Sequence, residues 1–256
     1  MAGGDGEMAM SAAHVLVVAG SDSSGGAGIA RDIETISAFG VKTCLAVTAV
    51  TVQTHEAVSR VDLCAPEMVE AQMLAALSAN RVTAIKIGML GAGETVERVA
   101  AILRANADIP VVLDPVIASS SGRALLADDA IETMREKLMP LCSLVTPNLP
   151  ELALLTREEE AECEADRHAQ AGRMLAGGVR ALLVKGGHAR GVRAVDTLFR
   201  ADGPSLRFDG PRLPGAMRGT GCMLASAVAA GLARGDALEA SVRTAKTHLS
   251  ERWLAA

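Results

Sequence analysis

The sequence is poor in aromatic side chains, with three Phe, one Trp and no Tyr among 256 residues. Nucleic-acid-binding surfaces commonly combine stacking aromatics with clustered basic side chains. This chain has no basic cluster, and its 25 basic and 30 acidic residues give a formal net charge of −5. The composition therefore argues against a nucleic-acid partner and favours small molecules.

The chain also lacks the cysteine spacings of a disulfide framework or of a structural zinc site. Its cysteines are odd in number and scattered, with no Cys-x-x-Cys pair: Cys44, Cys64, Cys142, Cys163 and Cys222. This usage is typical of a protein in a reducing cytoplasm.

Long apolar runs are missing as well, and none approaches the about 20 residues that a membrane span needs. Residues 1–12 carry Asp5 and Glu7 and lack the basic start of a signal peptide. We therefore expect no membrane partner and a cytoplasmic location. We also expect a flexible tail over residues 1–12 and a single domain over residues 13–256, because this length suits one large α/β domain.

What the sequence does contain is an alternation of apolar, β-branched runs with longer helical patterns. The predicted strands are His14–Ala19, Lys42–Thr48, Ala84–Ile87, Val111–Asp114, Ser143–Thr146, Ala181–Lys185, Val195–Phe199 and Leu206–Phe208. The predicted helices are Gly26–Ala38, Pro66–Ser78, Glu94–Ala105, Asp128–Leu138, Glu158–Ala176, Thr220–Arg234 and Ala237–Leu254. This order predicts an α/β fold with a central, mostly parallel sheet and helices on both faces. Ligands of such sheets bind at the carboxyl ends of the strands.

A glycine-rich stretch, Arg218-Gly219-Thr220-Gly221-Cys222, leads directly into a run of small residues that is predicted to be helical. The two glycines allow backbone N–H groups to turn toward one point, and the helix dipole adds partial positive charge, so the stretch suits an anion. A thiol at a helix N-terminus has a lowered pKa, and we expect this of Cys222. The alternative is a tight turn without a ligand.

The loop from Gly20 to Gly28 also joins a predicted strand to a predicted helix. Arg31 stands where a dinucleotide-binding fingerprint needs its third glycine, and the loop lacks the Gly-Lys-Ser/Thr ending of a P-loop. The loop instead allows close approach of a polar ligand. Asp32, one turn into the helix, is placed to hydrogen-bond that ligand, or it is a solvated helix acid.

Several polar and apolar side chains lie at or just after predicted strand ends. Gln53, which follows a strand that ends near Thr51, could present its amide to a heteroaromatic ring, while Met89 and Val116 could cover a flat ligand; structural roles in a loop or in the core are their alternatives. A carboxylate such as Asp114, placed beside a phosphate site, commonly holds Mg²⁺ or its waters. Lys185 places an ammonium where a nucleotide phosphate could lie, or it belongs to a turn.

The segment Thr146-Pro147-Asn148-Leu149-Pro150-Glu151 combines two prolines with an amide and a carboxylate three residues apart. The prolines fix the loop, and this spacing can aim Asn148 and Glu151 at one hydrated cation. The alternative is the start of a helix, where Glu151 would favour the dipole.

Taken in order, these motifs resemble a known family. GSDSSGGAGI with Asp32, KIGML, LDPV, TPNLPEL, KGGH and GTGC are spread over residues 14–254. The set is similar to that of the hydroxymethylpyrimidine/phosphomethylpyrimidine kinases of thiamine biosynthesis, in the ribokinase-like superfamily. The resemblance implies a ribokinase-like three-layer sandwich. It also implies an enzyme that uses ATP and Mg²⁺ to phosphorylate 4-amino-5-hydroxymethyl-2-methylpyrimidine and then its monophosphate. Because the family is often dimeric, a homodimer is the implied assembly.

The resemblance further implies the residues that bind substrate and cofactors. The pyrimidine would contact Gly20, Asp32, Gln53, Met89 and Val116. Magnesium and the phosphates would be organised by the Asn-x-x-Glu element, which here is Asn148 and Glu151. The nucleotide side would include Lys185, Asp114, Arg218 and Lys246.

The catalytic centre implied by the resemblance is the start of the helix after Arg218. Thr220 and Gly221 would lie in the anion hole, and Gly219 would belong to the same catalytic stretch. Cys222 stands where this family carries a cysteine and where sugar kinases of the superfamily carry an aspartate base. It would therefore accept the proton of the substrate hydroxyl.

One departure from the family pattern is Met217-Arg218, where the family has Thr-His. Arginine is a permanent cation with a planar donor fork, so Arg218 could clamp phosphate, or it could mark another substrate or a copy without turnover. Two alternative functions stay open: a kinase of vitamin B6 compounds such as pyridoxal, and a catalytically silent sensor of thiamine precursors. Retention of Asn148, Glu151, Lys185 and Cys222 argues against the sensor.

Overall fold

The computed structural model describes residues 12–118, 122, 125–188, 193–215 and 217–255. The tail predicted over residues 1–12 therefore lies, apart from its last residue, outside the described part. Within the described residues the main sheet has eight strands in the order β10-β9-β8-β7-β6-β5-β1-β2. The strands are β1 His14–Ala19, β2 Lys42–Val47, β5 Val82–Ile87, β6 Val111–Leu113, β7 Leu144–Val145, β8 Ala181–Val184, β9 Arg193–Arg200 and β10 Leu206–Pro211. All neighbours from β2 to β8 pair in parallel, and β9 and β10 are antiparallel.

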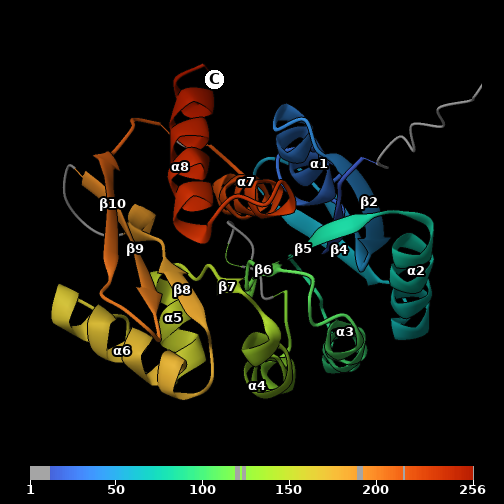
Figure 1. Ribbon diagram of the computed structural model, residues 1–256, viewed down its shortest axis with the longest axis horizontal. Coiled ribbons are helices and arrows are strands. Elements are labelled where there is room, and N and C mark those ends of the chain that lie inside the picture. Colours follow the sequence, from blue (N-terminus) through green and yellow to red (C-terminus); the bar gives the residue numbers. More distant parts are fainter. Residues whose placement is uncertain (1–11, 119–121, 123–124, 189–192, 216, 256) are drawn as a thin grey trace, which may run out of the picture.

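Helices cover both faces of this sheet, as predicted (Figure 1). One layer holds α1 Gly28–Ala38, α7 Thr220–Ala233 and α8 Leu238–Leu254. The other holds α2 Pro66–Ala79, α3 Gly93–Ala105, α4 Asp128–Thr133, α5 Leu149–Thr156 and α6 Glu164–Ala176. Successive side chains of β1 divide between the two layers: Val15 and Val17 pack into the core under α1 and α7, whereas Leu16 and Val18 pack into the core under α2 and α3. This two-sided burial explains why β1 is apolar throughout.

A separate hairpin, β3 Ala49–Gln53 with β4 Val58–Leu63, was not predicted beyond a strand that ends near Thr51. Its alternation is visible in the burial, since Ala49 and Thr51 are buried while Val50 and Val52 are each 55% exposed. Ala49 and Thr51 also bond to the first loop, through Ser21 N to Ala49 O at 2.8 Å and Thr51 Oγ1 to Ser21 O at 2.8 Å. The hairpin is therefore a wall beside the loop after β1.

The helical prediction over Glu158–Ala176 is wrong at its beginning. Helix α5 ends at Thr156, followed by Arg157 in the left-handed region with φ of 58°. Helix α6 then begins at Glu164, where the Asp166 carboxylate accepts a hydrogen bond from Cys163 N at 3.1 Å. The charged stretch before it is consequently a connection between two helices, not a helical face.

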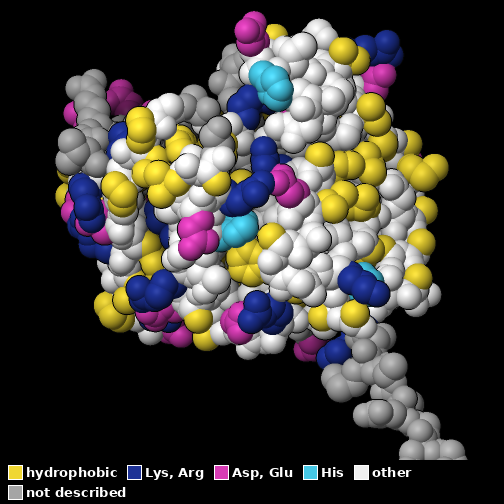
Figure 2. Space-filling view, turned by 90° about the horizontal axis from the view of Figure 1, so that it is seen from above, with side chains coloured by type: hydrophobic (Ala, Val, Ile, Leu, Met, Phe, Trp, Pro, Cys, Tyr) yellow, Lys and Arg dark blue, Asp and Glu magenta, His cyan; other side chains and the backbone are white. Residues whose placement is uncertain are grey.

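On the face seen in Figure 2, basic and acidic side chains are interspersed. This distribution on one face agrees with the absence of a basic cluster in the sequence. No helix in the described part of the chain combines the length and apolarity that a membrane crossing requires.

The sheet order also determines where a ligand can bind. From β1 the chain first moves outward to β2 and later returns on the other side to β5, so the direction of winding reverses beside β1. In open α/β sheets, such a reversal leaves a crevice at the carboxyl ends of the strands. The loops after β1, β5, β6, β7 and β8 meet the start of α7 there.

Candidate active site

A cavity of about 750 Å³ lies at this edge of the sheet. Its size is within the range of small-molecule and cofactor sites. Every predicted site residue except Asp32 lines it: Gly20, Gln53, Met89, Asp114, Val116, Asn148, Glu151, Lys185, Arg218, Gly219, Thr220, Gly221, Cys222 and Lys246. Residues from the first strand to the last helix thus share one cavity.

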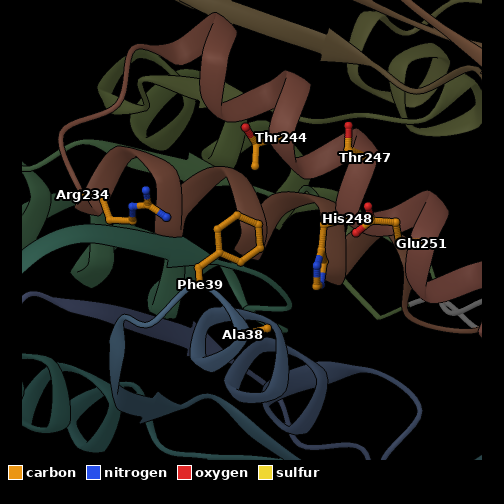
Figure 3. Close-up of a pocket in the computed structure, with 7 residues that line it drawn as sticks. All are labelled: Ala38, Phe39, Arg234, Thr244, Thr247, His248 and Glu251. Atoms are coloured by element: carbon orange, nitrogen blue, oxygen red, sulfur yellow. The ribbon is translucent and has the colours of Figure 1, made fainter.

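A second, more open cavity of about 280 Å³ lies between the end of α1 and α8 (Figure 3). Its ring pair, Phe39 and His248, meets edge to face with centroids 5.1 Å apart. Arg234, which follows the last residue of α7, also lines this cavity, so it lies at the end of the helix opposite Cys222. Because it contains none of the predicted site residues, we take the larger cavity as the candidate active site.

The start of α7 is pressed against the loop after β1. Its N-cap Gly219 has φ of 70°, and a Cβ there would collide with the carbonyl oxygen of Gly26. A Cβ on Gly221 would lie 3.2 Å from Lys185 Nζ and 3.3 Å from Asp114 Oδ2. As the N-cap glycine has no side chain to cap the helix, the N–H groups of the first turn are left to an anion that enters beside Lys185.

Replacing Gly219 by alanine is expected to lower both the stability of the protein and the activity of this site. Gly235, with φ of 88° and open space within 4 Å of the point where a Cβ would lie, is the matched control. Both alanines carry the left-handed strain of about 1–2 kcal/mol, but only Gly219→Ala must also move the loop at Gly26. Thermal unfolding with single-turnover kinetics measures both effects. Equal losses of activity in the two variants would contradict the close contact.

The ammonium of Lys185 lies between two carboxylates. It donates to Asp114 Oδ1 at 2.8 Å and lies 3.7 Å from Glu151 Oε2. Asp114 also accepts from Thr146 Oγ1 at 3.2 Å. Burial raises the pKa of Asp114, but the ammonium groups of Lys185 and Lys86 outweigh this and hold it below its usual value. Burial lowers the pKa of Lys185, and the two carboxylates raise it above its ordinary value, so it remains a cation.

Asn148 and Glu151 form a capping box at the start of α5. Asn148 Oδ1 accepts from Glu151 N at 2.8 Å, and Glu151 Oε2 accepts from Asn148 N at 2.8 Å. The helix-start alternative is therefore confirmed, and both residues also line the cavity. Burial raises the pKa of Glu151 to about 7, because the nearby Lys185 compensates only part of the lost hydration.

Among the described residues, no group of three or more His, Cys, Asp or Glu side chains is arranged to hold a metal ion. Magnesium binds proteins through one or two carboxylates and keeps several waters. Glu151 can supply one such carboxylate through the oxygen that does not accept from Asn148 N, because Lys185 compensates only part of the hydration that its buried carboxyl group has lost. The site therefore suits a hydrated divalent cation that is shared with phosphate oxygens.

The prediction of a lowered thiol pKa at Cys222 is wrong. Burial raises the pKa of this thiol to about 11, and the attraction of Lys86 offsets only part of that change. Asp32 and Asp114 raise it further, while a hydrogen bond from the Gly28 backbone lowers it. Cys222 is thus a neutral thiol at pH 7 in this structure.

The structure contradicts the alternative that Asp32 is a solvated acid, and it gives Asp32 no direct access to the cavity. Asp32 is fully buried and does not line the cavity. Its carboxylate accepts from Lys86 Nζ at 2.9 Å and from Ser226 Oγ at 2.7 Å. Lys86, which does line the cavity, was missed. The available signal was a lone lysine in the otherwise uncharged strand β5.

Two basic residues assigned to the nucleotide have their donors engaged by the protein. Arg218 bonds to Asp22, Ser24 and the Thr54 carbonyl, so the structure does not support its prediction as a free phosphate clamp. Lys246 Nζ donates to Asp196 Oδ2 at 2.8 Å, and Asp196 Oδ1 accepts from Gly186 N at 2.8 Å. Asp196 was missed by the sequence analysis. It connects α8 to the loop after β8.

Comparisons with known proteins lead to the same fold. The family model for phosphomethylpyrimidine kinase matches residues 22–254. The hydroxymethylpyrimidine/phosphomethylpyrimidine kinase of Rhizobium meliloti (strain 1021) is 44% identical over 243 residues, which cover 93% of this chain and 89% of that relative. The solved phosphomethylpyrimidine kinase of Clostridium difficile 630 has a TM-score of 0.81 and 31% identity, covering 94% of this chain and 99% of the other.

A solved pyridoxal kinase is also similar. The Staphylococcus aureus enzyme in complex with AMP-PCP and pyridoxal has a TM-score of 0.83 and 28% identity, covering 92% of this chain and 85% of the other. The solved structures confirm the predicted ribokinase-like α/β fold, and the family match confirms the predicted phosphotransferase class. With a family model that spans nearly all of the sequence, and a relative of 44% identity that matches over almost its full length, this chain belongs to the phosphomethylpyrimidine kinase family.

Proposed function

We propose that the protein uses ATP to phosphorylate 4-amino-5-hydroxymethyl-2-methylpyrimidine, and then its monophosphate, in thiamine biosynthesis. The observation that carries the proposal is the meeting of Cys222 and the first turn of α7 with Lys185 and Asp114 in one cavity. Phosphoryl transfer needs mainly positioning and stabilisation of charge on the transferring group. The N–H groups at Gly219–Gly221 and the Lys185 ammonium supply both.

In this proposal the pyrimidine lies between the loop after β1 and the ends of β3, β5 and β6. Met89 is 8% exposed and, with Val116, offers an apolar surface to a flat ring. Gln53 offers an amide to the ring edge, and Gly20 allows close approach of the backbone. Asp32 does not contact the ring in this proposal. It accepts a hydrogen bond from Lys86, which lines the cavity, and so fixes the position of that lysine.

The thiolate form of Cys222 is proposed to take the proton of the substrate hydroxyl at its Sγ atom, which becomes the thiol. Lys185, held between Asp114 and Glu151, stabilises the phosphates, and Lys246 stabilises the nucleotide side through its bond to Asp196. Bound Mg²⁺ would neutralise charge on the phosphates, and Glu151 would hold it with Asn148 fixing the loop.

The proposal also includes a cytoplasmic location and a homodimer. Exposed apolar side chains on the hairpin support the second of these: Val50 and Val52 are each 55% exposed and Leu63 is 48% exposed. A second copy of this chain would cover them. Sedimentation equilibrium at micromolar concentration tests the dimer, and a monomer under these conditions would contradict it.

A pyridoxal kinase is the second candidate, favoured by the similarity to the Staphylococcus aureus enzyme. A coupled ADP-release assay with the pyrimidine alcohol, its monophosphate and pyridoxal separates the candidates. We expect ADP release with both pyrimidines and a lower kcat/KM for pyridoxal. Turnover of pyridoxal alone would support the second candidate. Pyrimidine binding without any ADP release would identify the silent sensor.

A further inference from the structure

Arg218, which lines the cavity, joins three segments of the chain. Its Nη1 donates to Ser24 Oγ at 3.0 Å and to the Thr54 carbonyl at 2.7 Å, and its Nη2 donates to Asp22 Oδ2 at 3.2 Å. The arginine side chain is 19% exposed and that of Asp22 is 3% exposed, so this ion pair is shielded from water. The guanidinium thus connects the approach to α7 with the first loop and with the hairpin.

The partners of Arg218 lie on both sides of Gln53. On one side, Asp22 Oδ1 accepts from Ser24 N at 2.9 Å and from Ser24 Oγ at 2.7 Å, which closes the turn that Arg218 holds. Ser23, inside that turn, bonds to both backbone groups of Gln53, each at 2.8 Å. On the other side, Thr54 follows Gln53 directly. Arg218 therefore fixes the Gln53 backbone through two independent routes.

The geometry of these bonds needs an arginine. Both hydrogens of Nη1 are used by the two acceptors, while Nη2 faces the carboxylate of Asp22. A planar fork can serve three acceptors at once, whereas a lysine ammonium or a histidine ring cannot reproduce its spacing. The charge of Arg218 is already balanced by Asp22, which leaves little reason for a phosphate to bind it.

We propose that Arg218 is a specificity-determining positioning residue, which holds the Gln53 amide against the edge of a flat heteroaromatic substrate. This inference rests on the proposed function, because it concerns the pyrimidine side of that site. On this inference, Arg218 supports the binding of the pyrimidine alcohol and does not bind the nucleotide. The residue at position 218 then also influences whether the enzyme prefers the pyrimidine or pyridoxal.

The test compares the KM for the pyrimidine with the KM for ATP in three variants: Arg218→Ala, Arg218→Lys and Asp22→Asn. For Arg218→Ala we expect the pyrimidine KM to rise at least tenfold, since charged hydrogen bonds are lost, while the ATP KM stays within about twofold and kcat within about threefold. Asp22→Asn should move the pyrimidine KM in the same direction. In the double variant Arg218→Ala/Asp22→Asn, the rise in the pyrimidine KM should be smaller than the product of the rises in the two single variants. Calorimetric binding of the pyrimidine without nucleotide should weaken in parallel.

Arg60→Ala is the matched control, because Arg60 lies on β4 of the same hairpin and forms a local ion pair with Asp62 at 2.7 Å. It should leave both KM values unchanged. A higher ATP KM with an unchanged pyrimidine KM in Arg218→Ala would overturn the inference and show a phosphate clamp. If that variant does not fold, Arg218→Lys and Asp22→Asn carry the same test. A wild-type enzyme that neither binds nor phosphorylates the pyrimidine would instead overturn the proposed function, and this inference with it.

Discussion

Replacing Cys222 by alanine should lower the rate of phosphoryl transfer by about 10²–10⁴-fold, which is the usual contribution of a general acid or base. Its thiol lines the cavity at the first turn of α7 and is the proposed acceptor of the hydroxyl proton. Pyrimidine binding should change little, since Gln53, Met89 and Val116 stay in place. Single-turnover kinetics together with equilibrium binding separates the two effects.

The control for this variant is Cys163→Ala, at an exposed cysteine that precedes α6 and does not line the cavity. It should retain the wild-type rate. Cys222→Ser adds a second comparison, because its hydroxyl is far less acidic than a thiol. Near wild-type turnover in Cys222→Ala would remove Cys222 from the mechanism.

The raised pKa of Cys222 predicts how activity depends on pH. With a pKa of about 11, the thiol is protonated in the free enzyme at pH 7. As long as the pH is below this pKa, each increase of one pH unit raises the thiolate fraction about tenfold. The pH dependence of kcat/KM reports the ionisation of the free enzyme. We therefore expect kcat/KM of the wild type to rise from pH 7 to pH 9. A profile that is flat over this range would argue against the thiolate as the base.

The strands and the loop before α7 were predictable because their signals are local. A strand buried on both faces needs apolar residues at every position, as in β1. The glycine pattern around Gly219 follows from one backbone angle and one close contact with Gly26. Such features depend on few residues, so the sequence around them is enough to identify them.

The state of Cys222 and the place of Asp32 depend on tertiary burial, which the local sequence does not contain. The helix N-terminus favours a thiolate, but the loss of water around the partly buried Cys222 has the larger effect on its pKa. Asp32 was placed correctly on α1, yet whether it faces solvent, ligand or Lys86 depends on β5 and α7. The hairpin β3–β4 was missed for a related reason, since its outer face is exposed and its strands are only half apolar.

Lys86→Met should destabilise the protein by about 3–5 kcal/mol, the range found when one partner of a buried ion pair is removed. Lys86 and Asp32 are both fully buried, with Nζ 2.8 Å from Oδ1. Without the ammonium, Ser226 is the one side chain among the described residues that still donates to the Asp32 carboxylate. Burial already raises the pKa of Asp32, and loss of Lys86 raises it further. The folded variant then holds a proton that the unfolded chain releases, so its destabilisation should grow as the pH rises above the ordinary pKa of an aspartate.

Urea unfolding of four proteins tests this expectation: the wild type, Lys86→Met, the double variant Lys86→Met/Asp32→Leu, and Lys137→Met. Lys137 pairs with Glu97 at 2.5 Å on the surface, where both side chains are about half exposed, so its loss should change the free energy of unfolding little. The double variant should recover most of the lost stability, because apolar side chains can replace a buried ion pair at little cost. It should still be slow in catalysis, since Lys86 lies beside Cys222 in the cavity and attracts its thiolate. A Lys86→Met variant that is as stable as Lys137→Met would show that the buried pair contributes nothing to the fold.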